Sequence, residues 1–250
     1  MVNRLPQYIA YPHRPGFMKR HIPNAITCCN LICGCIAVQQ AFAGHTDACF
    51  LFIVLGAAFD FCDGFAARLL HVSSAIGKEL DSLADCITFG FAPATLIYHM
   101  LQQCRPETMP WMPYAAFLLA AFSALRLAKF NLDERQALGF IGLPTPACAL
   151  FWASLCYIVQ HDTRLTFWMQ QYPVHAAAAI IALLLLSCWI LVSEVPMFAL
   201  KFKTYGWKGN GLRYSFIAAS AAVIAACGWG GFAFVILLYV ILSALTQEKA

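Results

Sequence analysis

Charged residues are scarce in this chain of 250 residues. Lys, Arg, Asp and Glu make up 11% of it, and 61% of the residues are hydrophobic, whereas charged residues are about 25% of an average soluble protein. So little charge excludes a disordered chain and a water-soluble globular domain. The net charge of +4 is too small to indicate a nucleic-acid partner. The composition instead predicts a membrane protein with several spans.

The chain also lacks a recognisable thiolate motif. None of its twelve cysteines forms a Cys-x-x-Cys pair, and most of them lie inside apolar segments. Cysteines at such positions behave as small apolar side chains. We therefore expect neither a disulfide framework nor a thiolate metal site.

Long apolar windows are abundant. A membrane-crossing helix needs about 20 largely apolar residues, and the windows predict an all-α polytopic bundle of about eight transmembrane helices, with six as the alternative. The last two windows flank Gly228-Trp229-Gly230-Gly231 and could form a tight hairpin or one bent element. The predicted spans are 25–43, 48–70, 79–101, 111–129, 144–160, 174–192, 214–228 and 230–246.

The N-terminal residues differ from this pattern. Residues 1–23 are polar and contain four prolines, so we expect a cytoplasmic arm on the membrane surface and no cleavable signal peptide. Residues 24–250 are expected to form a single transmembrane catalytic domain.

Lys and Arg are distributed unevenly between alternate loops. Fourteen of the sixteen fall on one side, and only Arg105 and Arg164 fall on the other. Because Lys and Arg are enriched in cytoplasmic loops, this asymmetry predicts a multi-pass protein of the cell (inner) membrane with both termini in the cytoplasm.

Four aspartates interrupt the second and third apolar windows: Asp60, Asp63, Asp81 and Asp85. An ionisable group at bilayer depth costs at least a few kcal/mol, so it normally faces a protein interior and marks function. We expect the four acids to lie near the cytoplasmic boundary, where they could meet the phosphate of a lipid headgroup.

Helical spacing places the acids on two faces. Asp60 and Asp63 share a face with Gly56, Gly64 and Ala67, which have small side chains or none. Small residues permit the close approach of a ligand or another helix. On the next helix, the acids share a face with a glycine and a threonine, and the short connection 71–78 makes the helices antiparallel neighbours. We therefore expect the two acidic faces to meet.

Facing carboxylates repel one another unless a cation neutralises them. Oxygen-only ligation favours Mg²⁺ or Mn²⁺, and four carboxylates suffice for two ions that clamp a phosphate. One alternative is that the acids pair with Arg68, Lys78 or backbone donors and lock the bundle. A second alternative is a cation-coupled transporter, which would spread its acids along several helices.

Read as a string, the region is Asp60-x-x-Asp63-Gly64-x-x-Ala67-Arg68, eight residues, Gly77-x-x-x-Asp81-x-x-x-Asp85. At every fixed position it resembles the signature of the CDP-alcohol phosphotransferase family. The resemblance implies a helical membrane enzyme, commonly a homodimer. Such an enzyme moves a phosphatidyl or similar group from a CDP-linked donor to an alcohol and releases CMP. Polyprenyl transferases also use aspartates, but with a different spacing.

Three further segments narrow the resemblance to the bacterial phosphatidylserine synthases of this family. They are Ile22–Thr27 with Asn30 and Gly34, Arg126–Asn131, and Phe140–Pro146. Lys129 stands where many relatives have Arg. The positive charge is kept, but lysine cannot bind a phosphate or carboxylate in the bidentate way that arginine can. The similarity covers roughly the first 150 residues, and the last 100 show helices without an assignable motif.

The resemblance implies a role for each matching position. Asp60, Asp63, Asp81 and Asp85 are expected to hold two divalent ions, with Asp85 also the catalytic general base. Serine is expected to bind through Arg126, Lys129 and Asn131. The residues expected to bind the CDP-lipid are Asn24, Thr27, Asp60, Gly64, Ala67, Arg68 and Gly77.

Some assignments stay open. Asn24 and Thr27 could simply cap a helix, Arg68 could be a cytoplasmic anchor, and the loop that follows Arg126 could be solvated. The expected substrates are CDP-diacylglycerol and L-serine, but glycerol phosphate, inositol phosphate or choline could also be the acceptor. The aspartates cannot separate these acceptors, so we expect residues 126–146 to do so.

Overall fold

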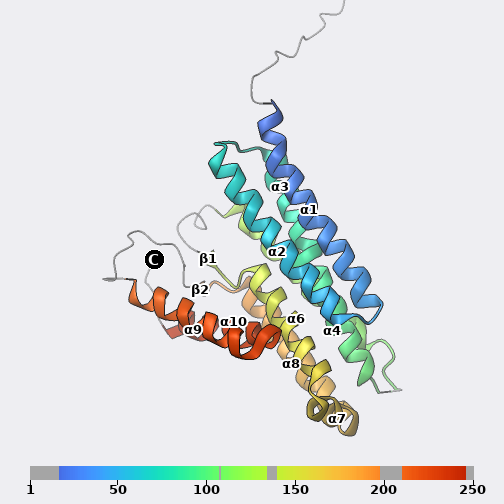
Figure 1. Ribbon diagram of the computed structural model, residues 1–250. Coiled ribbons are helices and arrows are strands. Elements are labelled where there is room, and N and C mark those ends of the chain that lie inside the picture. Colours follow the sequence, from blue (N-terminus) through green and yellow to red (C-terminus); the bar gives the residue numbers. More distant parts are fainter. Residues whose placement is uncertain (1–16, 107, 134–139, 198–209, 246–250) are drawn as a thin grey trace, which may run out of the picture.

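The computed structural model describes residues 17–106, 108–133, 140–197 and 210–245. Most of the predicted N-terminal arm therefore lies outside the described residues. The described part is almost entirely helical (Figure 1). Its elements are α1 Phe17–Phe42, α2 Thr46–Leu69, α3 Ala75–Asp85, η1 Cys86–Phe91, α4 Ala92–Gln103, η2 Met112–Phe117, α5 Leu118–Leu132, β1 Phe140–Ile141, α6 Thr145–His161, α7 Thr163–Gln171, α8 Pro173–Val192, β2 Pro196–Met197, α9 Gly211–Cys227, η4 Gly228–Gly230 and α10 Gly231–Leu245.

Six helical segments in the described residues are long and apolar enough to cross a membrane. This finding agrees with the predicted alternative of six spans, and the predicted eight are not confirmed. The six are His21–Phe42, Thr46–Leu69, Ala75–Gln103, Met112–Leu132, Pro173–Val192 and Gly211–Leu245. The orientation of these segments relative to the cytoplasm stays a prediction.

Three windows explain the difference in count. The window predicted at 144–160 is α6, which has only 17 residues and is therefore short of the usual length. The windows predicted at 214–228 and 230–246 are α9 and α10, which pack side by side and join through the turn η4 (Figure 1). Gly228 allows this turn because its φ is +57°, a conformation that favours glycine. Residues 211–245 are therefore counted together as one candidate span, although the chain turns between the two helices.

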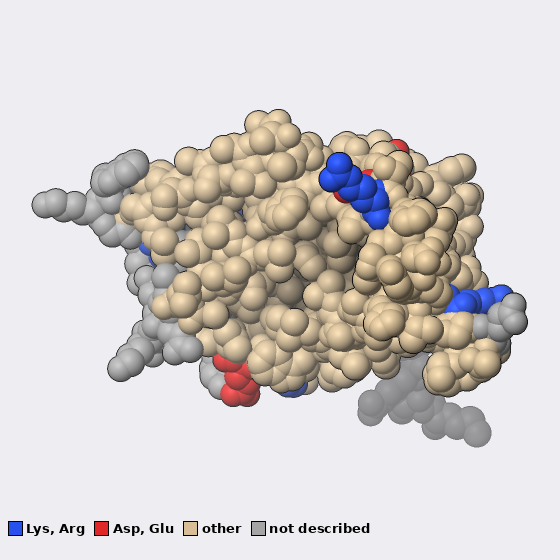
Figure 2. All heavy atoms as spheres, turned by 90° about the horizontal axis from the view of Figure 1, so that it is seen from below, with Lys and Arg blue, Asp and Glu red and all other residues tan. Residues whose placement is uncertain are grey.

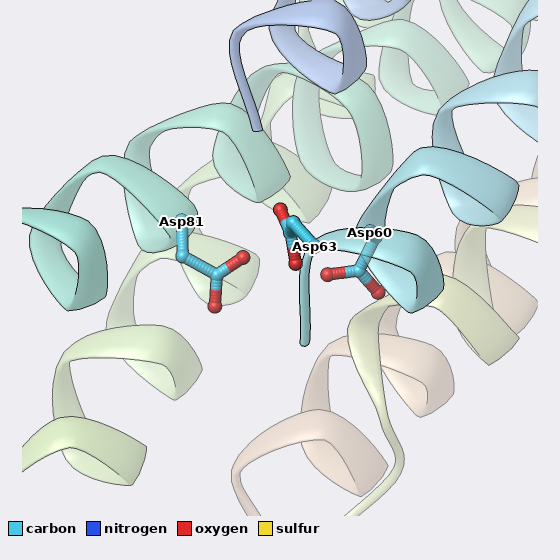
Figure 3. Close-up of side chains that lie close together, drawn as sticks. All are labelled: Asp60, Asp63 and Asp81. Atoms are coloured by element: carbon cyan, nitrogen blue, oxygen red, sulfur yellow. The ribbon is translucent and has the colours of Figure 1, made fainter. Parts of the chain in front are cut away.

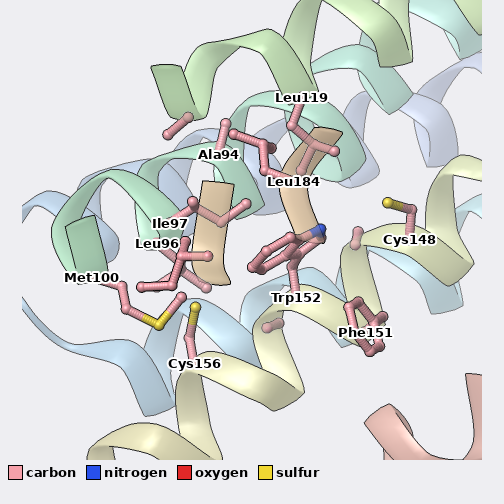
Figure 4. Packing of buried hydrophobic residues seen from close by; sticks show 14 of the residues in the cluster. Ala94, Leu96, Ile97, Met100, Leu119, Cys148, Phe151, Trp152, Cys156 and Leu184 are labelled. Atoms are coloured by element: carbon pink, nitrogen blue, oxygen red, sulfur yellow. The ribbon is translucent and has the colours of Figure 1, made fainter. Parts of the chain in front are cut away.

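The apolar character of α6 follows from its position in the core. Trp152, Ala149 and Ala153 on α6 are fully buried, and α6 packs against α2, α4 and α10. Figure 4 shows Trp152 among other buried side chains, such as Ile97 and Leu184. The indole Nε1 of Trp152 donates a hydrogen bond to Ser187 Oγ on α8 at 3.2 Å. A helix buried on most sides is apolar whether or not it crosses a membrane.

The surface carries little charge. Figure 2 shows one face on which Lys, Arg, Asp and Glu cover only a few small areas. Large apolar side chains also point outward from the spans: Phe61 on α2 is 67% exposed, and Leu69 and Trp189 are similarly exposed. Such a surface is expected where lipid tails, rather than water, surround the helices.

Segment Ala75–Gln103 is a continuous helix with a change of pitch. The π-helical η1 begins directly after Asp85 and carries Thr88 between α1 and α2. A Cβ on Gly34 would lie 2.9 Å from the Thr88 backbone, and one on Gly56 would lie 2.4 Å from the Thr88 side chain. Only glycines therefore allow α1, α2 and η1 to approach this closely, and π segments are frequent beside functional sites.

A short β pairing departs from the expected all-α fold. β1 and β2 are antiparallel, with Phe140 opposite Met197 and Ile141 opposite Pro196. Beyond the pairing, Gly142 N donates to Val195 O at 2.9 Å, and Leu143 N donates to the backbone oxygen of Ile190 in α8 at 3.2 Å. The segment before α6 is thereby held across the C-terminal end of α8.

Candidate active site

Three of the four predicted acids meet between α2 and α3. Asp60 and Asp63 project from α2, Asp81 projects from α3, and their carboxylates turn toward one another (Figure 3). One oxygen of each lies within 4.8 Å of the others. The contact between the two acidic faces, which was expected from helical spacing, is confirmed.

Asp63 is positioned by the first helix. It is 6% exposed, and its Oδ2 accepts a hydrogen bond of 2.6 Å from the hydroxyl of Thr27 on α1, which is also buried. Thr27 is thus in contact with the acid cluster, and it does not cap a helix because it lies well inside α1. The contact fixes the orientation of one carboxylate.

Asp85 lies beside this cluster rather than within it. The group of carboxylates close enough to share an ion contains Asp60, Asp63 and Asp81 but not Asp85. Asp85 is 7% exposed, and its Oδ1 accepts a hydrogen bond of 3.1 Å from Asn30 Nδ2. Asn30 in turn accepts at its backbone oxygen from Thr88 Oγ1 at 3.1 Å. Asp85 is therefore a buried carboxylate held in place next to the ligand cluster.

Asn30 and Thr88 had no predicted role in the site. Both are fully buried. Asn30 holds Asp85 from the neighbouring helix α1, and Thr88, three residues after Asp85, binds the backbone of Asn30. The signal in the sequence was present, because Asn30 belongs to the segment that resembles the family and Thr88 shares a helical face with Asp81 and Asp85.

A cavity of about 270 Å³ opens beside the acids. Asp63 and Asp81 line it, together with Ser74 and Lys78. Five of the seven residues predicted to bind the CDP-lipid also line it: Asn24, Thr27, Gly64, Ala67 and Gly77. We call this space the acidic cavity. Helices α1, α2 and α3 therefore place small residues and carboxylates around one volume.

The two glycines of the acidic cavity differ in surroundings. A Cβ on Gly77 would lie 2.9 Å from both Asn24 Oδ1 and Ser74 Oγ. Ser74 is the N-cap of α3, and its hydroxyl accepts a hydrogen bond from Gly77 N at 2.9 Å. A Cβ on Gly64 would meet nothing within 4 Å. Gly77 thus permits a tight wall, while Gly64 leaves open space.

Arg68 does not line the acidic cavity. Its side chain is exposed, and Nε donates a hydrogen bond of 3.0 Å to the backbone oxygen of Gly64 on its own helix. The remaining predicted residue, Asp60, belongs to the acid cluster and is also absent from the cavity lining.

A second cavity of about 270 Å³ contains two of the three residues predicted to bind serine. Arg126 and Lys129 from α5 line it, together with Asp133 after α5 and Glu194 after α8. We call it the mixed-charge cavity. Arg126 is 7% exposed, and its Nε has no hydrogen-bond partner among the described residues.

Asn131 makes different contacts from those expected. Its Nδ2 donates to Ser82 Oγ at 2.8 Å, and its backbone oxygen accepts from Lys78 Nζ at 2.7 Å. Asn131 does not line the mixed-charge cavity. It instead joins the end of α5 to α3, directly beside Asp81. Arg126 is also within electrostatic reach of Asp85, so the mixed-charge cavity lies next to the acids.

The acid cluster fits a divalent cation. The donors are oxygens only, which suits Mg²⁺ or Mn²⁺. In addition, Asp81 Oδ1 is buried without a hydrogen-bond partner among the described residues, although buried polar atoms are nearly always paired. A bound cation would satisfy this oxygen.

Comparison with known proteins agrees with this geometry. Residues 20–197 match the model of the family described as CDP-alcohol phosphatidyltransferase. The chain is 37% identical over 140 residues to a Bacillus subtilis protein named CDP-diacylglycerol–serine O-phosphatidyltransferase, covering 56% of this chain and 74% of that protein. A protein of the same name from Methanocaldococcus jannaschii is 30% identical over 189 residues, covering 72% of this chain and 87% of that protein.

A yeast protein is also similar to this chain. The Saccharomyces cerevisiae protein of the same name is 38% identical over 118 residues, covering 44% of this chain and 41% of that protein. The similarity therefore extends across bacteria, archaea and yeast.

Proposed function

The chain belongs to the CDP-alcohol phosphatidyltransferase family, and from this premise we propose that it transfers the phosphatidyl group of CDP-diacylglycerol to L-serine. The serine hydroxyl forms a bond to the phosphorus that carries the diacylglycerol, the bond to CMP breaks, and the products are phosphatidylserine and CMP. The observation that supports the proposal is the meeting of three carboxylates, two of which, Asp63 and Asp81, line a cavity together with small residues.

The acidic cavity is proposed to receive the donor. Its small wall residues, Gly64 and Ala67, leave room for the cytidine and its two phosphates, while the lipid tails stay in the bilayer. Asn24 and Ser74 offer hydrogen-bonding groups at the same wall, and Lys78 offers a positive charge. We further propose that Arg68 turns from its own helix to a donor phosphate.

Asp60, Asp63 and Asp81 would hold the first divalent ion, and with Asp85 they would hold a second. Mg²⁺ or Mn²⁺ bound there would neutralise charge on the donor phosphates. In phosphoryl transfer, the protein mainly positions the reactants and neutralises charge on the phosphates. Thr27 supports this role because it orients Asp63.

Asp85 is proposed as the general base that takes the proton of the serine hydroxyl. It is buried beside the cluster, and Asn30 holds one of its oxygens at 3.1 Å. A general base must lie within hydrogen-bond reach of the proton that it removes. Arg126 and Lys129 in the adjoining cavity are proposed to bind the serine carboxylate and to bring the hydroxyl toward Asp85.

The membrane supplies the setting for this reaction. Six candidate spans identify a multi-pass membrane protein, and the uneven distribution of Lys and Arg supports an inner-membrane location with the site near the cytoplasmic face. We also propose that the protein works as a homodimer, as the resemblance implies.

The test is a transfer assay with the purified protein. Labelled L-serine and CDP-diacylglycerol should yield CMP and labelled phosphatidylserine. Chelation should abolish turnover, and Mg²⁺ or Mn²⁺, but not Zn²⁺ alone, should restore it. Glycerol phosphate, inositol phosphate and choline are assayed in parallel. Transfer to one of them instead of serine would show that it, and not serine, is the acceptor. Metal-independent turnover would refute the proposed metal-binding role of the acid cluster.

A further inference from the structure

We propose that Asp133 and Glu194 bind the ammonium group of the acceptor, so that the mixed-charge cavity recognises an amino acid as a zwitterion. The inference rests on the proposed serine transfer and deepens it. Arg126 and Lys129 account for the carboxylate, but a carboxylate site alone does not distinguish an amino acid from a simple hydroxy acid.

Among the described residues, the charges that line the cavity are balanced. Two cationic side chains, Arg126 and Lys129, share the wall with two acidic ones, Asp133 and Glu194. A free amino acid carries one charge of each sign, and opposite charges placed close to both give charge-assisted hydrogen bonds. A sugar phosphate would bring negative charge to the acids, and choline would leave the cations without a partner.

Arg126 shows that the cavity is built to receive a ligand. The residue is more than nine-tenths buried, and its Nε is a buried atom with no hydrogen-bond partner among the described residues. Phe130 covers one side of it, with the ring centroid 5.5 Å from Cζ. A buried charge without full hydrogen bonding is costly, and an incoming carboxylate would remove that cost.

The two acids reach the cavity from separate parts of the fold. Asp133 is the C-cap of α5, one turn after Lys129, and its backbone N donates to Lys129 O at 3.0 Å. Glu194 follows α8, close to where Gly142 crosses the end of that helix and bonds to Val195. The β pairing thereby holds the wall that carries Glu194 in a defined place.

The position of the cavity is suitable for an acceptor. Arg126 lies within electrostatic reach of Asp85, the proposed base, and Asn131 ties the end of α5 to Ser82 on α3. A ligand held between the cations and acids is therefore next to the acid cluster, while the donor occupies the acidic cavity.

The experiment combines Asp133→Asn and Glu194→Gln with 3-hydroxypropionate, which is serine without its amino group. Serine kinetics and competitive inhibition by 3-hydroxypropionate are measured for the wild type and both variants at saturating CDP-diacylglycerol. The matched control is Glu79→Gln, which removes an exposed acid of α3 that lines neither cavity.

We expect the KM for serine to rise about 10- to 100-fold in each variant, the loss expected for a hydrogen bond to a charged group. The inhibition constant of 3-hydroxypropionate should stay within about twofold, as should the KM for the donor, which is measured separately at saturating serine. 3-Hydroxypropionate could also fail to inhibit the wild type and the variants, even at concentrations far above the serine KM. This result would support the inference as well, provided that the serine KM of the variants rises as stated.

An unchanged serine KM in both variants would overturn the inference, as would an equal loss for serine and 3-hydroxypropionate. In either case the wild type still converts serine, so the proposed function stands. A wild type that transfers nothing to serine refutes the proposed function instead. Thermal unfolding of each variant in detergent separates these results from misfolding.

Discussion

The two cavities have similar volumes but are assembled differently. The acidic cavity uses residues 23–81, from three consecutive helices with short connections. The mixed-charge cavity joins residues near the end of α5 to Ile141 of β1 and to the end of α8, about 60 residues later. One is built by neighbours in the sequence and the other by distant segments.

This difference shows which contacts can be predicted from helical periodicity and which cannot. A helical repeat states which residues share a face, and a short connection states which helix lies beside it. Both suffice for the acidic cavity. Neither can place the end of α8 against α5, because these two helices are remote in sequence and meet only in the folded bundle. The following predictions test whether the acidic cavity serves the reaction with the donor and the mixed-charge cavity serves acceptor binding.

Asp63→Asn should have the largest effect. Removing one carboxylate from the cluster should lower turnover by about 10³-fold or more with any acceptor, because neutralisation of phosphate charge is worth several kcal/mol. Release of CMP at saturating substrates is the measurement. The control Asp47→Asn removes an exposed acid at the other end of α2 and should keep full activity. An active Asp63→Asn protein would contradict the assigned role of the cluster.

Asp85→Asn should also abolish turnover but should leave binding of the CDP-lipid within about tenfold. The substituted amide cannot take a proton, whereas the donor cavity is lined by other residues. Binding is measured with the inactive variant by equilibrium titration of the lipid. Retained turnover would remove Asp85 as the base, and lost binding would assign it to the donor site.

Gly142→Ala should affect the mixed-charge cavity and spare the acidic one. Its φ is +74°, and a Cβ would lie 2.7 Å from Leu191 O, so the segment must shift away from the end of α8. We expect a loss of about 1–3 kcal/mol in stability and a serine KM raised about tenfold, with the donor KM unchanged. Gly211→Ala, where a Cβ meets nothing within 4 Å, is the control. Equal changes in both KM values would show that the cavities are not independent.

Gly77→Ala should give the smallest effect, in the opposite cavity. The added methyl would lie 2.9 Å from Asn24 Oδ1 and Ser74 Oγ, both at side-chain ends that can move. We expect the donor KM to rise about threefold to tenfold, consistent with a packing cost of about 1 kcal/mol, and the serine KM to stay unchanged. A rise confined to serine would reverse the assignment of the two cavities.

The sequence predicted much of the site because its signals are local. Asp60, Asp63 and Asp81 meet as expected, and five of the seven predicted donor residues line one cavity. The number of spans was less predictable. The window at α6 is apolar throughout, as core helices and membrane-crossing helices both are, and its 17 residues keep it out of the six candidate spans. The predicted membership of Asp85 in the metal cluster and the serine-binding role of Asn131 stay predictions, and the described contacts place both residues against other partners.

Composition and helical spacing were enough to establish a helical membrane protein with a cluster of acids on two facing helices. A charge at bilayer depth is so costly that its presence alone identifies a site. The helical period then indicates which face of each helix carries the acids. The wall of the mixed-charge cavity required the folded chain, because Glu194 carries no motif and acquires its neighbours through a β pairing and a helix end that are remote in sequence. Contacts between distant segments follow from how all the helices pack together, and no local pattern encodes them.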